Sequence, residues 1–175
     1  LAKEGIGENV FRTGNTVIDA LLSVINKEHK FENEELNKID FDNKVILLTA
    51  HRRENWGEPM KNIFAAVREV AEQNKDVQII FPMHKNPLIR DLARESFKGI
   101  EHKVALIEPL EYVDFANLMN KCYLIMTDSG GIQEEAPALG KPVVVLRTET
   151  ERPEAVKAGT VKLAGVERNK IFEIT

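Results

Sequence analysis

The motif DSGGIQEE at residues 128 to 135 directly follows an apolar run, Tyr123 to Met126, that is typical of a buried parallel strand. A strand, a glycine turn and a helix start in this order can form a phosphate cradle. Gly130 and Gly131 carry no Cβ to obstruct a ligand, and N–H groups at a helix start attract an anion. Glu135, one turn inside that helix, could accept hydrogen bonds from two ribose hydroxyls. Ser-Gly-Gly after a strand is also common in simple tight turns, so the motif alone leaves both interpretations open.

A second segment whose side chains could bind a ligand or take part in catalysis is HRRENWG at residues 51 to 57. It follows the apolar run Lys44 to Thr49. Three potentially cationic side chains in a row need nearby anions or carboxylates, and arginine forks match phosphate oxygens in a bidentate way. The alternative is a solvated basic turn capped by Glu54. We favour an anion site, because this loop follows a strand on the side where ligands bind to parallel sheets.

Three further candidates follow other apolar runs. His84 stands in PMHKNP at residues 82 to 87, where a lone histidine is more often a structural hydrogen-bonding residue than a catalyst. Phe115 could meet a base, although it is otherwise an ordinary core residue. Arg152 precedes Pro153, which opens another helix, and would face the cleft there, whereas a surface ion pair is the default for an arginine.

The elements that must position these residues alternate between strand and helix. This alternation predicts right-handed crossovers and an α/β fold with a doubly wound parallel sheet. The five loops that follow the strands would then converge at the carboxyl edge of the sheet. We expect strands at 44–49, 77–81, 104–107, 123–126 and 143–146, and helices entered at Asn15 or Thr16, at Pro59 and at Pro87, over 114–120, and from near Ile132 to Leu139. The apolar positions predict the inner faces of two helices: Met60, Ile63, Phe64, Val67, Val70 and Ala71 in the helix that contains Pro59, and Leu88, Ile89, Leu92 and Ala93 in the helix that begins at Pro87.

Length and composition narrow the functional classes. The chain has 175 residues, 43% hydrophobic content and a formal net charge of −4, with 24 basic and 28 acidic residues. We therefore expect one well-buried domain, with no basic footprint for nucleic acid or for an anionic membrane. The single cysteine, Cys122, lies beside an apolar run, which fits a buried residue in a reducing, cytoplasmic compartment. No segment has the length of a membrane span or the pattern of a signal peptide.

Metal and cofactor chemistry find little support in the sequence. Asp40-Phe41-Asp42 has the spacing of a metal-binding pair used by one class of sugar transferases, but it precedes its strand and so lies at the wrong edge of the sheet. No Cys/His cluster, GxxxxGK[ST] loop or GxSxG elbow is present. We expect no metal ion and no cofactor.

Four segments together resemble the non-hydrolysing bacterial UDP-N-acetylglucosamine 2-epimerases in order and spacing: HRREN (51–55), PMHKNP (82–87), DSGGIQEE (128–135) and RTETERPEAVKAGTVKL (147–163). The opening TGNTVIDAL (13–21) is similar to that family's hinge and first helix, so the resemblance covers essentially the whole chain.

The resemblance implies a particular domain organisation. Residues 17–175 would form a UDP-binding, Rossmann-like domain behind a hinge at residues 1–16, as one half of a two-domain enzyme of the glycosyltransferase-B shape. The amino-terminal domain, with its catalytic carboxylates, and a final crossing helix would be absent from this chain.

The resemblance also implies an activity. The family interconverts UDP-N-acetylglucosamine and UDP-N-acetylmannosamine by eliminating UDP to give 2-acetamidoglucal and adding UDP back on the other face. Ser129, Gly130 and Gly131 would hold phosphate, while Glu135 would hold the ribose and Phe115 would lie by the uracil.

Other positions matching the family would act around this site. Arg152 would contact the nucleotide, and His51 would act in catalysis beside the diphosphate. Arg52 and His84 would belong to a second, activating UDP-N-acetylglucosamine site. The full-length enzyme would be a cytoplasmic homodimer serving cell-surface polysaccharide biosynthesis, whereas this half alone would bind UDP without catalysing the reaction.

Two other functions share parts of the pattern. The donor-binding domain of a glycosyltransferase-B enzyme would share the sheet, the glycine turn and the ribose carboxylate, but it would not need HRREN. A non-catalytic nucleotide-sugar sensor could use the same half-cleft. If the full-length protein forms an epimer without an acceptor, it is an epimerase and not a glycosyltransferase. Carboxylates placed for C2 proton transfer in an amino-terminal sequence would favour an enzyme over a sensor.

Overall fold

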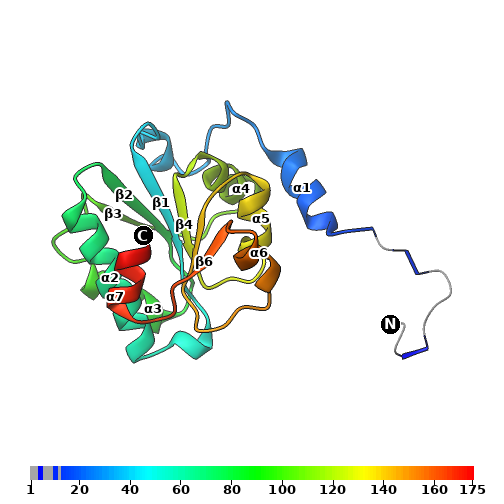
Figure 1. Cartoon of the computed structure of the whole chain (residues 1–175). Coiled ribbons are helices and arrows are strands. Elements are labelled where there is room, and N and C mark those ends of the chain that lie inside the picture. The colour runs from blue at the N-terminus through cyan, green and yellow to red at the C-terminus, as the bar shows by residue number, and fades with distance from the viewer. Residues whose placement is uncertain (1–3, 6–9, 12) are drawn as a thin grey trace.

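The computed structural model describes residues 4–5, 10–11 and 13–175, which build a six-stranded parallel sheet (Figure 1). Its order is β3-β2-β1-β4-β5-β6, so the chain winds from the centre to one edge, returns, and winds to the other edge. This is the predicted doubly wound topology, and the winding reverses between β1 and β4. The strands are β1 (Lys44–Thr49), β2 (Val77–Pro82), β3 (Val104–Ile107), β4 (Leu124–Thr127), β5 (Val143–Val145) and β6 (Val161–Leu163).

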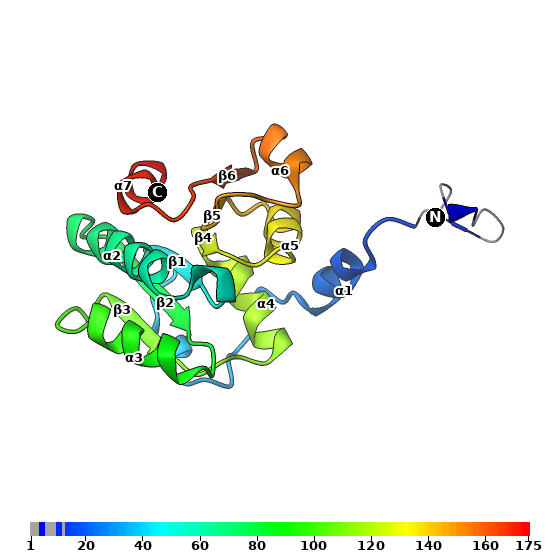
Figure 2. The same ribbon diagram turned by 90° about the horizontal axis from the view of Figure 1, so that it is seen from below.

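Helices cover both faces of the sheet (Figures 1 and 2). On one face lie α2 (Glu58–Gln73), α3 (Pro87–Ser96) and α7 (Arg168–Ile174). On the other lie α1 (Thr16–Val24), α4 (Tyr112–Lys121) and α5 (Ile132–Ala138). The short α6 (Pro153–Lys157) lies beside β6, and the single-turn 3₁₀ helices η2 (Leu36–Lys38) and η3 (Arg53–Asn55) sit in loops.

Strand residues alternate between two buried clusters, as expected for central parallel strands. In β1, Ile46 and Leu48 belong to the cluster under α2, while Val45 and Leu47 belong to the cluster on the opposite face. The predicted inner face of α2 is confirmed, since all of its members are buried: Met60, Ile63, Phe64, Val67, Val70 and Ala71. Cys122 is also buried, as predicted, and burial raises the pKa of its thiol well above the usual range.

Several details differ from the sequence prediction. Leu88, assigned to the inner face of α3, is 68% exposed, because α3 buries the face that carries Ile89 and, one turn later, Ala93. α4 begins at Tyr112 rather than Asp114, which is itself buried. β6 was not predicted, since it has only three residues and includes the exposed Lys162.

The predicted hinge at residues 1–16 falls partly on residues 1–3, 6–9 and 12, outside the described residues, and its boundary stays a prediction. The start of α1 is as predicted: Asn15 caps the helix, and its side-chain oxygen accepts from the N–H of Val17 at 3.1 Å. Among the helices of the described segments, none has both the length and the apolar character to cross a membrane.

Candidate functional site

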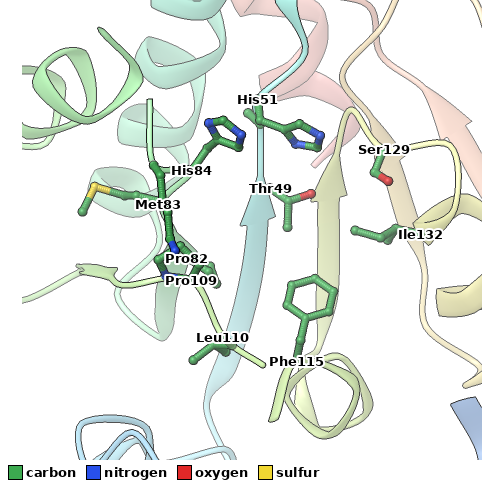
Figure 3. A pocket seen from close by; sticks show the side chains of 12 residues that line it. Thr49, His51, Pro82, Met83, His84, Pro109, Leu110, Phe115, Ser129 and Ile132 are labelled. Atoms are coloured by element: carbon green, nitrogen blue, oxygen red, sulfur yellow. The ribbon is translucent and has the colours of Figure 1, made fainter. Parts of the chain in front are cut away.

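A cavity of about 400 Å³ opens at the carboxyl edge of the sheet, close to the point where the winding reverses (Figure 3). Loops after β1, β2, β3 and β4 line it, which confirms four of the five predicted to converge. The fifth loop, after β5, does not line the cavity but reaches the glycine turn, where Glu151 lies 3.7 Å from the position of a Cβ on Gly130. Most of the wall is apolar, and the lining residues whose side chains could recognise or act on a ligand are His51, His84, Lys85, Phe115 and Ser129.

Two histidines, in the loops that follow the neighbouring strands β1 and β2, meet at this cavity. The rings of His51 and His84 stack with centroids 5.6 Å apart and an interplanar angle of 11° (Figure 3). Nδ1 of His84 accepts from the N–H of Asn86 at 3.1 Å, which places the proton of that ring on Nε2. His84 therefore makes the structural hydrogen bond expected of a lone histidine and also faces the cavity.

The Ser-Gly-Gly turn presents bare backbone beside the cavity. The N–H of Ser129 donates within the turn, to Oγ1 of Thr127 at 2.9 Å. The N–H groups of Gly130 and Gly131 donate to no group in the described part of the chain. Neither glycine has a positive φ, and a Cβ on Gly131 would meet no atom within 4 Å. Backbone strain therefore does not require these glycines, whose effect is to leave two amides open to a ligand.

A cluster of four charges lies behind this turn. Arg147, which is 8% exposed, donates to Glu54 from Nε at 2.9 Å and to both oxygens of Glu151 at 2.6 and 2.9 Å. These hydrogen bonds raise the pKa of Arg147, and Arg147 lowers the pKa of Glu151 to about 2. Arg52 lies within 3.7 Å of both carboxylates and of the position of a Cβ on Gly130. The carboxylates of Glu54 and Glu151, from two loops, thus compensate part of the positive charge of the segment HRREN (51–55).

Glu135 and Arg152 lie outside the residues that line the cavity. Glu135 is half-buried, and burial, with a smaller effect of Glu134, raises the pKa of its carboxyl. Its carboxylate accepts no hydrogen bond from the described chain. Arg152 stands at the start of α6, where its side chain bonds Glu134, which also accepts from Asn15. Arg152 thus makes the ion pair that is the default for an arginine, and its contact with a nucleotide stays a prediction.

Sequence reasoning missed a set of buried polar residues that hold the turn in place. Gln133 is fully buried, donates to the carbonyl of Ser129 at 3.1 Å and accepts from Thr150. Asp128 and Asn55 are also buried and bond each other at 3.1 Å. A polar residue at the end of an apolar strand was the available signal for Asp128, whereas nothing local marks the other two.

The acidic pair Asp40 and Asp42 lies in the loop before β1. Asp40 accepts from the N–H of Asp42 at 3.0 Å and from Asn43, at the end of β1 remote from the cavity, so this pair serves as a polar connector. Within the described residues, no three His, Cys, Asp or Glu side chains gather closely enough to share a metal ion.

An open parallel sheet with bare amides and an apolar cavity at its carboxyl edge is the architecture of a Rossmann-like domain, a class that binds ligands at this edge. The family model described as UDP-N-acetylglucosamine 2-epimerase matches residues 1–175. The chain belongs to this family.

Individual relatives agree with this assignment. The UDP-N-acetylglucosamine 2-epimerase of Bacillus subtilis is 51% identical over 167 residues, which cover 95% of this chain and 43% of the relative. The epimerase of Neisseria meningitidis bound to UDP-GlcNAc is 47% identical with a TM-score of 0.86, over 99% of this chain and 48% of that one. The S. aureus MnaA–UDP structure is 46% identical with a TM-score of 0.88, over 99% and 46%. The chain thus spans about half the length of the relatives it matches.

A more distant likeness shows the fold alone. The glycosyltransferase WaaG is 15% identical with a TM-score of 0.60, over 86% of this chain and 44% of WaaG. The domain therefore has the architecture of one half of a glycosyltransferase-B-like protein.

Proposed function

We propose that this chain is the UDP-binding half of a UDP-N-acetylglucosamine 2-epimerase, and that the whole enzyme interconverts UDP-N-acetylglucosamine and UDP-N-acetylmannosamine. The observation that carries the proposal is a cavity with two histidines and an apolar wall, close to the point where the winding of the sheet reverses, with bare turn amides beside it, in a member of this family. Related structures with UDP and with UDP-GlcNAc bound support it.

Each part of uridine diphosphate has a matching group in this half. The free amides of Gly130 and Gly131, with the hydroxyl of Ser129, suit phosphate oxygens. The ring of Phe115, from α4, lines the same cavity and offers an apolar face to uracil (Figure 3). Glu135, whose carboxylate has no partner within the described chain, suits two adjacent ribose hydroxyls.

Other family positions take part when the cleft closes. Arg152 contacts the nucleotide after its side chain leaves Glu134, with which it pairs here. Arg52 and His84 bind a second, activating UDP-N-acetylglucosamine. The placement of the two residues supports this second site, because His84 lines the cavity and Arg52 lies beside the glycine turn.

The reaction divides labour between the two halves of the enzyme. In the elimination step a base removes the C2 proton and the bond from the anomeric carbon to the diphosphate oxygen breaks, so negative charge moves onto the departing UDP. A donor fixed where that charge develops lowers the barrier more than it strengthens substrate binding. We assign this task to His51 and assign the C2 proton transfers to carboxylates of the other half.

A UDP titration tests the binding function directly. Because a ligand that binds only the folded state stabilises it, UDP at a hundred times its Kd should add ~2.7 kcal/mol, or roughly 5–10 °C in Tm for a domain of this size. The titration is carried out in chelator, with ADP as the matched nucleotide control. The absence of any response to UDP would overturn the proposal. A response only with magnesium or manganese would show that UDP binding needs a divalent metal ion, contrary to our expectation.

Product analysis tests the activity of the whole enzyme. This chain alone should neither form the mannosamine epimer nor release UDP, and joining it to the amino-terminal half should restore both steps. Proton NMR in deuterated buffer detects the epimer and the exchange at C2. Transfer of the sugar to an acceptor without epimer would instead identify a glycosyltransferase. We further propose that the whole enzyme is a cytoplasmic homodimer, which sedimentation and cell fractionation would test.

A further inference from the structure

We propose that Asp128 is a positioning residue for His51. One oxygen of its buried carboxylate holds the imidazole at Nδ1 and so turns Nε2 towards the cavity. This inference deepens the proposed function and rests on it for the role of His51 towards the diphosphate, whereas the geometry of the pair stands independently.

The carboxylate of Asp128 is fully buried, and its two oxygens have different surroundings. Oδ2 accepts three hydrogen bonds: from the N–H groups of His51 and Arg52, each at 2.9 Å, and from Nδ2 of Asn55 at 3.1 Å. Oδ1 is also buried but accepts no hydrogen bond in the described chain. A buried carboxylate oxygen without a donor is costly, so the arrangement calls for one more donor at Oδ1.

The ring of His51 is placed to supply that donor. Its Nδ1 lies 3.4 Å from Oδ1 of Asp128, slightly beyond a normal hydrogen-bond distance. The two residues follow β1 and β4, whose last residues, Thr49 and Thr127, pair in the sheet and join their hydroxyls at 2.7 Å. The backbones are therefore fixed relative to each other. The His51 side chain, at 44% exposure, needs only a small rotation to close the distance.

His84 and Arg52, two neighbours of His51, are engaged with other groups. His84 stacks on the ring, but its Nδ1 accepts from Asn86. The guanidinium of Arg52 lies beside Glu54 and Glu151. Asp128 is therefore the carboxylate that directs the proton of His51 to Nδ1.

This geometry has a chemical consequence for a ligand in the cavity. With Nδ1–H held by Asp128, Nε2 of His51 faces the ligand side. The role towards the diphosphate belongs to the doubly protonated ring, in which Nδ1–H donates to Asp128 and Nε2–H donates to the diphosphate. The carboxylate stabilises this imidazolium, whose positive charge then lies beside the negative charge that grows on the departing UDP. Asp128 thus acts through His51 and does not itself touch the substrate.

The isosteric variant Asp128→Asn reverses this arrangement. Three donors converge on the Oδ2 position, so the amide oxygen of the new side chain must occupy it. The amide NH₂ then faces Nδ1 of His51 and forces this nitrogen to accept. The neutral ring would then carry its proton on Nε2, and the amide NH₂ beside Nδ1 would oppose a second proton there. The ring could therefore not form the imidazolium that the proposed role requires.

Nitrogen-15 NMR of the histidine-labelled chain measures the tautomer without any ligand. In the wild type, neutral His51 should be protonated at Nδ1; in Asp128→Asn the proton should move to Nε2, while His84 keeps its Nε2 proton in both proteins. A wild-type His51 protonated at Nε2, or a tautomer unchanged by the substitution, would overturn the inference. The wild-type spectrum alone decides the point if the variant fails to fold.

Kinetics of the whole enzyme separate a positioning role from a structural one. Asp128→Asn should lower kcat about a hundredfold or more with little change in KM. In a His51→Ala background it should cause no further loss, because both substitutions remove the same function. A full additional loss in that background would show that Asp128 only holds the loop together, and would overturn the inference. Failure of UDP to bind would instead refute the proposed function and leave the NMR result standing.

Discussion

The guanidinium of Arg147 is held by both carboxylate oxygens of Glu151, four residues later in the chain, at 2.6 and 2.9 Å. Glu54 accepts from the remaining side of the same group at 2.9 Å. The cluster joins the loop after β1 to the loop after β5, behind the glycine turn. Because Arg147 is almost fully buried, losing a partner leaves charge uncompensated, which costs more than losing a surface ion pair.

Glu151→Gln should lower the free energy of unfolding at pH 7, and the loss should fade in acid. The bond with Arg147 lowers the pKa of Glu151 from 4.5 to about 2 in the folded protein. Since the folded value is the lower one, the stabilisation is present above about 4.5 and is lost as pH falls towards 2. Urea denaturation between pH 7 and pH 2.5 measures the difference. The exposed Glu149, changed to Gln, is the matched control, and a gap between Glu151→Gln and wild type that is constant with pH would contradict the prediction.

Glu135→Gln should stabilise the fold at neutral pH while weakening the binding of UDP and uridine. Burial raises the pKa of Glu135, so the ionised carboxylate penalises the folded state once pH rises above the ordinary value of 4.5. The gain in Tm should therefore be present at pH 7 and absent at pH 3.5. Calorimetry should show a loss of up to ~1.5–3 kcal/mol per hydrogen bond to ribose.

The neighbouring Glu134 provides a control of opposite sign. Hydrogen bonds from Arg152, and secondarily from Asn15, lower its pKa, so Glu134→Gln should destabilise the protein at pH 7. Unchanged uridine affinity in Glu135→Gln would remove Glu135 from the binding site.

Asn117→Ala should destabilise the contact between α1 and α4. The fully buried Asn117 accepts from the N–H of Asn26 at 2.8 Å and donates to the carbonyls of Val24 and Val113, each at 2.9 Å. Buried groups left without partners cost about 1–3 kcal/mol each, so we expect a loss of roughly 2–3 kcal/mol in urea denaturation. Hydrogen exchange should accelerate first in α1.

Asn120→Ala, one turn of α4 nearer its end, is the control for this substitution. The side chain of Asn120 makes no hydrogen bond in the described part of the chain, so its loss should change stability little. Equal effects of the two substitutions would show that helix propensity, and not the bridge to α1, explains the loss.

Cys122 should not react with thiol reagents while the protein is folded. It is the single cysteine of the chain, it is fully buried, and burial raises the pKa of its thiol. Labelling with Ellman's reagent at pH 8 should therefore require unfolding, and its rate should rise with urea. Rapid stoichiometric labelling without denaturant would contradict the burial of this residue.

Much of the fold was predictable from the sequence, and particular elements show why. The inner face of α2, the cap at Asn15 and the strand Lys44–Thr49 depend on local periodicity and on one side-chain hydrogen bond, both visible within a few residues. Where the pattern is short or ambiguous, as in β6 and at Leu88, prediction failed because burial there depends on which neighbour covers the residue.

The sequence by itself determined the alternation of strands and helices, the edge of the sheet where the cavity opens, and the candidate residues on its loops. Only the tertiary structure decided how those residues are supported. Asp128 meets the backbone of His51 across 77 residues of chain, and Arg147 meets Glu54 across 93. No local pattern encodes such partners, because they come together only when parallel strands distant in sequence are paired side by side. The same pairing leaves one oxygen of Asp128 facing His51, and that geometry cannot be read from either segment alone.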